Sequence, residues 1–478
     1  MSAGGTKLAL LASAAVLLAP APALADTLKD ALLGAYRTNP TLQAARANQR
    51  ATDENVPINR ASGLPSASAT ATYTEQLKET TPDPTDLFAD RTLAGSISLS
   101  VPVYSGGSVR NSITAAEVRV KAGQADLRAT ESSVFSQTVT AYMDVILNES
   151  IVNLSAKNVD VLAVNLQATQ DRFQIGDLTR TDVAQSESRL ALAQSDLRSA
   201  RANLSSARER YIQIVGKQPE DLQAPPPLPG LPATPEEAVS VALENNPDLL
   251  GARERSNAAK YDINVAGAGR LPKLEVFTSG IYSDPLGSVA NGSNATGASA
   301  GVRATIPLFQ GGRPAAQERQ AQARSAAALE QEIGTERSVI SQVRAAFSSL
   351  QAANAIIAST QTAVSAAELS LEGVRAENTV GNRTILDILN AEQELLRARV
   401  QLVTARRNAY VAGFTLLAAT GRAEARDLGL NDEGVLYDPQ VNYDRVKHKI
   451  WDWSFDQDPT AQSTRTVDTP TQDGEVPE

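Results

Sequence analysis

Segments in which apolar and polar positions alternate occur as two pairs along the chain. In segments 93–103 and 301–309 apolar residues fill every second position, and segments 66–76 and 273–283 alternate less regularly. This period predicts strands with one apolar face, either in a membrane or as half-buried hairpins of a soluble sheet. Two hairpins give four strands, too few to close into a barrel, so a membrane barrel would need several chains.

Helical periodicity dominates the rest of the chain. After Asp182, and again after Asp387, apolar residues recur at every seventh position, with a row of small residues three positions further along. Such heptad seams favour close antiparallel packing of helices, with or without a lumen. The helical segment 107–173 would be about 100 Å long, and two shorter helices placed end to end would match it.

The same order of elements occurs twice. Asn39-Pro40 matches Asn246-Pro247 at a distance of 207 residues (246 − 39), and the glycine pair ending at Gly107 matches the pair ending at Gly312 at 205 (312 − 107). In each copy the residue pattern predicts a helical segment, two strands, a long helix, a tight turn and a shorter helix. We therefore expect a signal peptide at 1–25, a first structural repeat at 26–224, a Pro-rich linker at 225–235, a second repeat at 236–428, and a C-terminal segment at 429–478 with an acidic, disordered tail.

Composition narrows the function. The first residues combine Lys7, an apolar stretch of about a dozen residues and the small-x-small site Ala23-Leu24-Ala25, which predicts a cleaved export signal rather than a membrane anchor. With no Cys and one His, the chain offers no disulfide, no metal cluster and no nucleophile–base pair, so we expect neither an enzyme nor a cofactor. A formal net charge of −10 argues against nucleic acid as a partner.

Residues 380–392, which follow the second long helical segment, carry the most specific resemblance to a known family. Together with their counterpart at 175–183 and the glycine-ended segments 101–107 and 306–312, they resemble the TolC-like outer-membrane efflux protein family. The resemblance extends from about residue 27 to residue 428, nearly the whole mature chain.

This resemblance implies a mainly α-helical chain with a membrane β-barrel. Three tandem-duplicated protomers, with four strands each, would form a homotrimer with a 12-stranded outer-membrane β-barrel that continues into a long periplasmic α-helical barrel. The linker and the C-terminal segment would form an equatorial belt around the helices. The protein would lie in outer-membrane lipid of a Gram-negative cell and extend into the periplasm.

The family also implies a function and partners. The duct would passively conduct exported protein or small toxic molecules, and untwisting of the periplasmic helix tips would open it. Its partners would be a periplasmic adaptor (membrane-fusion) protein and an inner-membrane transporter, either ABC-type or proton-driven. The alternative is a periplasmic coiled-coil adaptor or structural protein without its own pore, but adaptors usually carry one helical hairpin and no membrane strands.

By resemblance, four residues near the helix turns form a closure latch. Arg383 would pair with Asp182 and Thr181 of a neighbouring protomer, and Asn378 stands where the family's prototype has a Tyr. A bidentate Arg–carboxylate bond suits a reversible latch. Without the resemblance, Arg383 and Asp182 would be interpreted as solvated surface charges.

The remaining site residues belong to the entrance and the tips. Asp387 would contribute to an acidic ring at the periplasmic entrance, and Asn390, in place of a second Asp, would halve the charge of that ring. Asp387 could equally be a carboxylate that stabilises a helix N-terminus. The glycines of the tips suit tight turns, and the expected adaptor-docking residues are Gly176, Asp177, Gly381 and Asn382.

Overall fold

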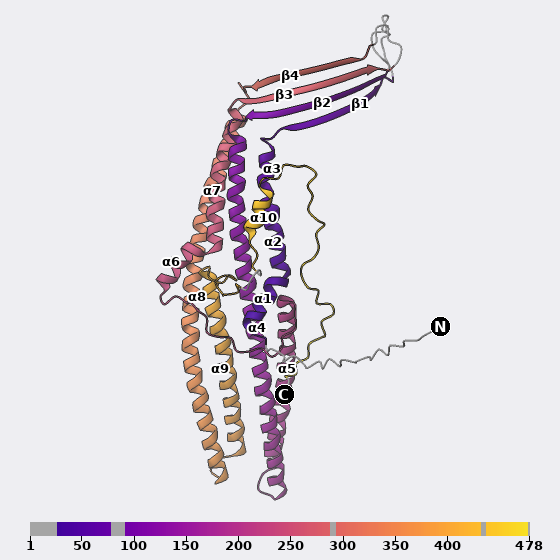
Figure 1. The fold of residues 1–478 in the computed structure, drawn as a ribbon. Helices are drawn as coiled ribbons and strands as arrows, with labels where there is room; N and C mark the ends of the chain where they lie inside the picture. Colours follow the sequence, from indigo (N-terminus) through magenta and orange to yellow (C-terminus); the bar gives the residue numbers. More distant parts are fainter. Residues whose placement is uncertain (1–25, 78–90, 287–292, 432–435, 477–478) are drawn as a thin grey trace, which may run out of the picture.

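The computed structural model describes residues 26–77, 91–286, 293–431 and 436–476. A sheet lies at one end of a group of long helices (Figure 1). The predicted signal peptide, 1–25, lies outside the described residues. Among the helices of the described ranges, none is at once long enough and apolar enough to span a membrane.

Both repeats fold into the same order of elements. The first contains α1 (Leu28–Thr38), α2 (Pro40–Asp53), α3 (Asn55–Ala61), β1 (Ser66–Glu75), β2 (Arg91–Tyr104), α4 (Ser108–Gln174) and α5 (Arg180–Val215). The second contains α6 (Pro235–Asn245), α7 (Pro247–Gly267), the 3-10 helix η1 (Ala268–Arg270), β3 (Lys273–Pro285), β4 (Ala295–Thr305), α8 (Arg313–Thr379) and α9 (Ile385–Ala419), and α10 (Pro439–Val446) follows. The long helices α4 and α8 each have 67 residues.

The four strands form one antiparallel sheet in the order β1-β2-β3-β4. Directly paired residues point to the same face of a sheet, so the register separates an apolar from a polar face. The apolar face carries Ala67, Ala69, Ala71, Tyr73, Leu93, Ile97, Leu99, Val101, Val276, Tyr282 and Val302. The polar face carries Ser66, Ser68, Thr70, Thr72, Ser96, Ser98, Ser100, Glu275, Ser279, Ser299 and Arg303. The exceptions are Phe277 and Ile281 on the polar face and Thr278, Asp284 and Thr296 on the apolar face. The prediction of strands with one apolar face is confirmed.

The expected strand at 301–309 is wrong in its second half. β4 ends at Thr305, which pairs with Lys273, the first residue of β3. Residues beyond 305 therefore have no partner on β3, and Pro307 has no N–H with which to extend the ladder.

One buried asparagine in each repeat, Asn39 or Asn246, joins two helices of that repeat in the same way. The Asn39 side chain accepts hydrogen bonds from the first turn of α2 and donates to the Ile214 carbonyl at the end of α5 (2.9 Å). Asn246 caps α7 and donates to the Ala419 carbonyl at the end of α9 (2.9 Å). An Asn at the N-cap leaves its amide free for this second bond. The duplication in sequence is therefore also a duplication of contacts.

Helix α7 lies between the long helices of the two repeats. Towards α4 it forms the ion pairs Arg255–Asp126 and Asp262–Arg119. Towards α8 it places Arg253 Nη2 4.0 Å from Glu336 Oε2. In the first repeat α2 packs on α4, and its Arg46, the counterpart of Arg253 (253 − 207), acts electrostatically on Glu131, the counterpart of Glu336 (336 − 205).

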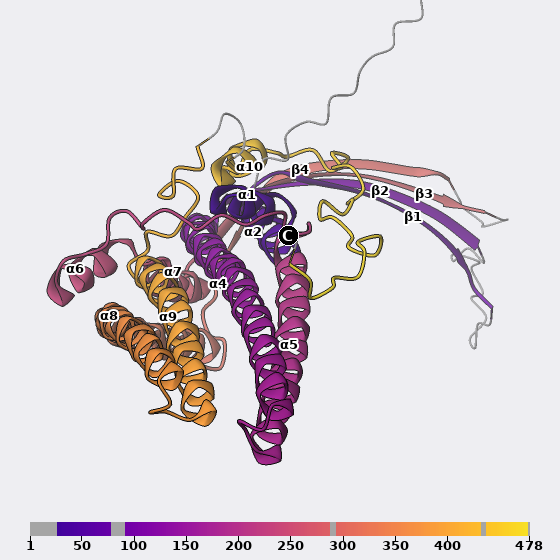
Figure 2. The ribbon, with the colours of Figure 1, turned by 90° about the horizontal axis from the view of Figure 1, so that it is seen from below.

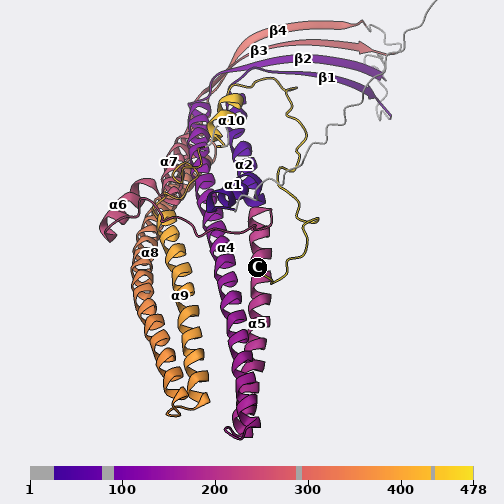
Figure 3. The ribbon, with the colours of Figure 1, turned by 60° about the horizontal axis from the view of Figure 1, so that its bottom comes forward.

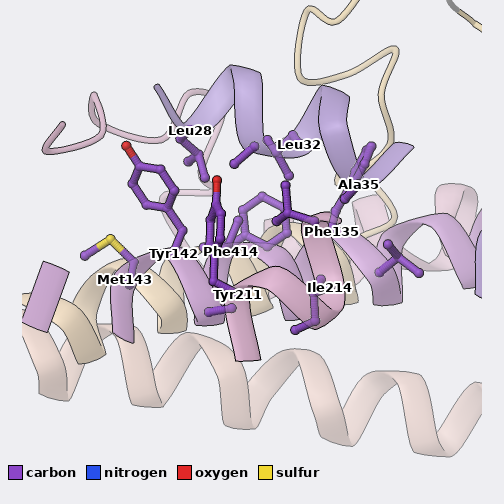
Figure 4. Packing of buried hydrophobic residues seen from close by; sticks show 14 of the residues in the cluster. Leu28, Leu32, Ala35, Phe135, Tyr142, Met143, Tyr211, Ile214 and Phe414 are labelled. Atoms are coloured by element: carbon purple, nitrogen blue, oxygen red, sulfur yellow. The ribbon is translucent and has the colours of Figure 1, made fainter. Parts of the chain in front are cut away.

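The main core lies where α1 and α5 meet the middle of α4. Figure 4 shows Phe135, Tyr142, Tyr211 and Phe414 packed beneath Leu28 and its neighbours on α1. The Tyr142 hydroxyl lies 2.6 Å from the carbonyl oxygen of Gln223. The chain just before the linker is thereby fixed to the core.

The C-terminal tail differs from the expectation of a disordered end. Figure 3 shows the chain end lying beside α5. Arg208 donates to the Glu475 carbonyl (2.9 Å), and the Gln472 N–H donates to the Glu209 carboxylate (3.0 Å). The acidic composition suggested disorder, but α5 offers Arg208 as a partly buried partner for this segment.

Candidate functional site

The free ends of the two helical hairpins, α4–α5 and α8–α9, are built by matching turns. Gly176 has φ 83° and its N–H donates to the Phe173 carbonyl (3.0 Å), while Gly381 has φ 81° and donates to the Asn378 carbonyl (3.0 Å). An added Cβ would meet nothing within 4 Å at either glycine. The left-handed backbone, rather than crowding, therefore requires glycine here.

Apolar side chains point outward at both tips. Ile175 is 80% exposed and Val380 is 70% exposed, and each directly precedes the turn glycine. Together with Asp177 and Asn382, which are also exposed, they give each tip a small apolar patch with a polar rim. We did not single out Ile175 and Val380 from the sequence, although β-branched residues beside a turn glycine are a usable signal.

Asp182 and Asp387 begin the returning helices in the same way. Each accepts hydrogen bonds from the backbone N–H and the hydroxyl of the preceding N-cap threonine: Thr179 at 2.9 and 2.7 Å, and Thr384 at 2.9 and 2.8 Å. The Thr179 side-chain hydrogen bond is the largest cause of the lowered pKa of Asp182, and the Thr384 backbone hydrogen bond is that of Asp387. Both carboxylates are therefore ionised at neutral pH, and both have a structural role as caps.

Arg383 finds its partner within its own turn. Its Nε lies 2.7 Å from Glu377 Oε2, and the Asn378 side-chain amide donates to the Arg383 carbonyl (2.7 Å). Within the described residues of a single chain, the structure does not bring Arg383 to Asp182 or Thr181. The pairing expected between neighbouring protomers stays a prediction, and Glu377 is a competing partner that sequence reasoning missed.

Asn390 connects the two hairpins. Its Oδ1 accepts a hydrogen bond from Arg189 Nη2 (3.0 Å), and Arg189 Nη1 also donates to Gln393. Arg189 lies on α5 and both acceptors lie on α9, so one side chain links the two repeats near their tips. Sequence reasoning treated Asn390 only as a lost charge, and no local pattern announces a partner 201 residues away.

Seen from below, each hairpin forms a pair of adjacent helices. Figure 2 shows α4 with α5 and α8 with α9, and α1, α2 and α10 gathered near the α4 side. The described residues contain no group of three or more His, Cys, Asp or Glu side chains suited to a metal ion. This end of the molecule therefore has exposed turns, carboxylates at the N-termini of α5 and α9, and the Arg189 contact between the two hairpins.

Comparison with known proteins gives consistent results. The family described as outer membrane efflux protein matches residues 34–217 and 238–422. The chain is 35% identical over 441 residues to the outer membrane efflux protein BepC of Brucella suis, covering 92% of this chain and 94% of BepC. It is 27% identical to the outer membrane protein TolC of Escherichia coli over 84% of each chain. The fold is similar to that of the CmeC outer membrane channel of Campylobacter jejuni, with a TM-score of 0.74 at 18% identity, over 88% of this chain and 89% of that one.

Proposed function

Because this chain belongs to the outer membrane efflux protein family and lies in the outer membrane, we propose that three copies of it form a passive exit duct. The duct carries exported protein or small toxic molecules delivered by an inner-membrane transporter. Its role is conduction and not catalysis.

The sheet is the observation that carries this proposal. Among the described strands β1 pairs only with β2 and β4 pairs only with β3, so both edges of the sheet are open. A sheet with one apolar and one polar face suits a wall between lipid and water, but in lipid every backbone N–H and C=O needs a partner. Three chains would pair these edges into a closed barrel of 12 strands (3 × 4).

The position of α7 supports the same association. In this chain α7 contacts its own long helix, α8, and the long helix of the other repeat, α4. Its counterpart α2 contacts its own long helix, α4. A neighbouring chain that repeats the arrangement would place its α8 against α2 and so complete the ring of helices.

The repeat shifts identify the residues at this interface. The counterparts of Arg119 on α4 and Asp262 on α7 are Arg324 on α8 (119 + 205) and Asn55 on α3 (262 − 207). In the assembly, Arg324 of one protomer lies close to Asn55 of the next. Here Asn55 takes the place of the Asp262 carboxylate, so this contact depends less on charge.

Cross-linking tests the proposed ring directly. The natural chain has no Cys, so the double variant Arg324→Cys, Asn55→Cys can be treated in membranes with a bismaleimide reagent. We expect covalent dimers and trimers on denaturing gels. The matched pair Arg119→Cys, Asp262→Cys should cross-link only within one chain.

A product that remains monomeric on these gels, and that fractionates with soluble periplasmic proteins, would instead support a coiled-coil protein without a pore. Conductance of the purified protein in planar bilayers tests the duct independently of the gels.

We propose that the tips form the regulated entrance of this duct. Arg383 exchanges Glu377 for Asp182 and Thr181 of the adjacent protomer in the closed state, with Asn378 holding the Arg383 backbone, and untwisting of the tips breaks these bonds. Three copies of Asp387 form an acidic ring that favours cations. The exposed tips, with Gly176, Asp177, Gly381 and Asn382 in their turns, receive a periplasmic adaptor through Ile175 and Val380.

A further inference from the structure

The chain between α10 and the tail carries an exposed aromatic loop, defined here as residues 450–455. Trp451 is 73% exposed, Trp453 75% and Phe455 78%, and Ile450 is exposed beside them. Trp451 and Trp453 are the only two Trp residues of the protein. So many large apolar side chains in one short loop mark a surface that meets an apolar partner.

Ion pairs hold this loop in its exposed position. The Arg445 guanidinium binds both carboxylate oxygens of Asp456, at 2.7 and 2.8 Å, and Lys449 lies 3.3 Å from the same carboxylate. Hydrogen bonding to Arg445 lowers the pKa of Asp456 to about 2, so this carboxylate stays ionised at neutral pH and keeps its ion pairs. The rings of Trp453 and Phe455 meet edge to face at 6.5 Å. The fold therefore fixes the exposure of the loop.

The loop begins close to the sheet. Arg60 of α3 donates to the Lys447 carbonyl, and its Nη1 lies 2.7 Å from His448 Nδ1. Ser66, the first residue of β1, is six positions after Arg60, and a chain of that length spans at most about 20 Å. In Figure 1 the yellow segment that follows α10 starts beside α3, beneath the sheet.

Aromatic residues lie towards both ends of the sheet. On its apolar face, Tyr73 and Tyr282 lie towards the end remote from the helices. At the end that adjoins the helices lie Tyr104 and, just beyond β4, Phe309, which is 89% exposed. Proteins that span a membrane as strands carry aromatic girdles at both membrane–water interfaces, where Trp and Tyr are enriched. The aromatic loop lies near the end of the sheet that adjoins the helices, where its side chains would extend such a girdle.

We propose that the aromatic loop inserts into the lipid–water interface on the periplasmic side of the outer membrane and anchors the C-terminal segment there. Trp451, Trp453 and Phe455 sit among the lipid head groups and upper acyl chains. The inference rests on the outer-membrane location of the sheet and does not require the duct to conduct.

Intrinsic fluorescence tests the proposal on the unaltered protein, because both Trp residues lie in the loop. The mature protein is reconstituted into phosphatidylcholine vesicles that contain lipids brominated either high or low on the acyl chain. We expect a blue-shifted emission that is quenched by bromine, more strongly by the shallow position than by the deep one. Acrylamide in the aqueous phase should quench weakly.

Two single-Trp reporters in a W451F, W453F background provide matched controls. Ile97→Trp on the apolar face of β2 should be quenched by brominated lipid, and Phe173→Trp at a helix tip should be quenched only by acrylamide. Acrylamide quenching of the natural Trp residues without bromine quenching would overturn the proposal, and quenching by neither reagent would do so too, because it would place the loop against another protein chain. In both cases a bromine-quenched Ile97→Trp would leave the membrane sheet intact.

Discussion

The long helices α4 and α8 occupy equivalent places in the two repeats and have the same number of residues, yet they are covered differently. Nineteen residues of α4 are buried and only eight of α8. Around α4 lie α1, α2, α3, α5, α7 and α9, whereas α8 has α6, α7 and α9. A duplicated design thus gives one long helix that is enclosed by its own chain and one with more uncovered surface, which the proposed ring would place against a neighbouring chain.

The joints made by Asn39 and Asn246 should be equivalent in spite of this difference in coverage. Asn39→Ala and Asn246→Ala each remove a helix cap, worth about 1 kcal/mol, and leave a carbonyl without its partner, worth about 1–3 kcal/mol. We expect each variant to lose about 3 kcal/mol of unfolding free energy, measured by chemical denaturation in detergent. A much smaller loss for Asn246→Ala would mean that the second repeat does not depend on its joint as the first does.

Glu131 should make stability depend on pH because it lies on α4, the long helix that the rest of the chain covers. Burial raises the pKa of Glu131 to about 7. Between about pH 4.5, its ordinary value, and pH 7 the folded chain holds a proton that the unfolded chain has released, so this group makes stability fall as pH rises. Glu131→Gln, which keeps the acceptor for the Ala425 N–H, should raise stability at pH 7.5 by about 2 kcal/mol.

The same substitution at the second repeat is the control for Glu131. Glu131→Gln should flatten the slope of melting temperature against pH between pH 4.5 and 7 more than Glu336→Gln, the matched substitution on α8, does. If both variants flatten the slope equally, the coverage of α4 is not the cause.

Conductance should distinguish the two tips. Arg383→Ser removes the proposed latch on the second hairpin, and we expect single-channel conductance in planar bilayers to rise several-fold. Arg172→Ser breaks an ion pair of similar exposure, to Asp177 on the first hairpin, and should leave conductance unchanged. Unaltered conductance in Arg383→Ser would discard the latch.

The link between the hairpins should have the smallest effect. Arg189→Ala removes the hydrogen bonds to Asn390 and Gln393 and should cost about 1 kcal/mol or less. Its signature is faster amide hydrogen exchange at both tips, with the exposed Arg198→Ala on the same helix as the control. Exchange rates equal to those of the natural protein would show that Arg189 does not hold the hairpins together.

Much of the fold could be predicted from the sequence because it is governed by local pattern. The heptads after Asp182 and Asp387, the turn glycines and the nearly constant repeat shift predicted two equal hairpins, and the alternation predicted the two faces of the sheet. The contacts of Arg189, Arg383 and the tail could not be predicted in this way. Each depends on a side chain brought close by tertiary packing or on one of several nearby carboxylates, and residue spacing does not choose among them.

The equal length of the two 67-residue helices has a further consequence for the reach of the tips. At 1.5 Å per residue each is about 100 Å long. The number of residues in these helices therefore sets how far the tips extend from the membrane. Deleting one heptad from α4 and α5 alone would retract one hairpin by about 10 Å and leave an uneven rim. The same deletion in all four hairpin helices would keep the rim level, which gives evolution a simple way to fit this protein to a narrower gap between membranes.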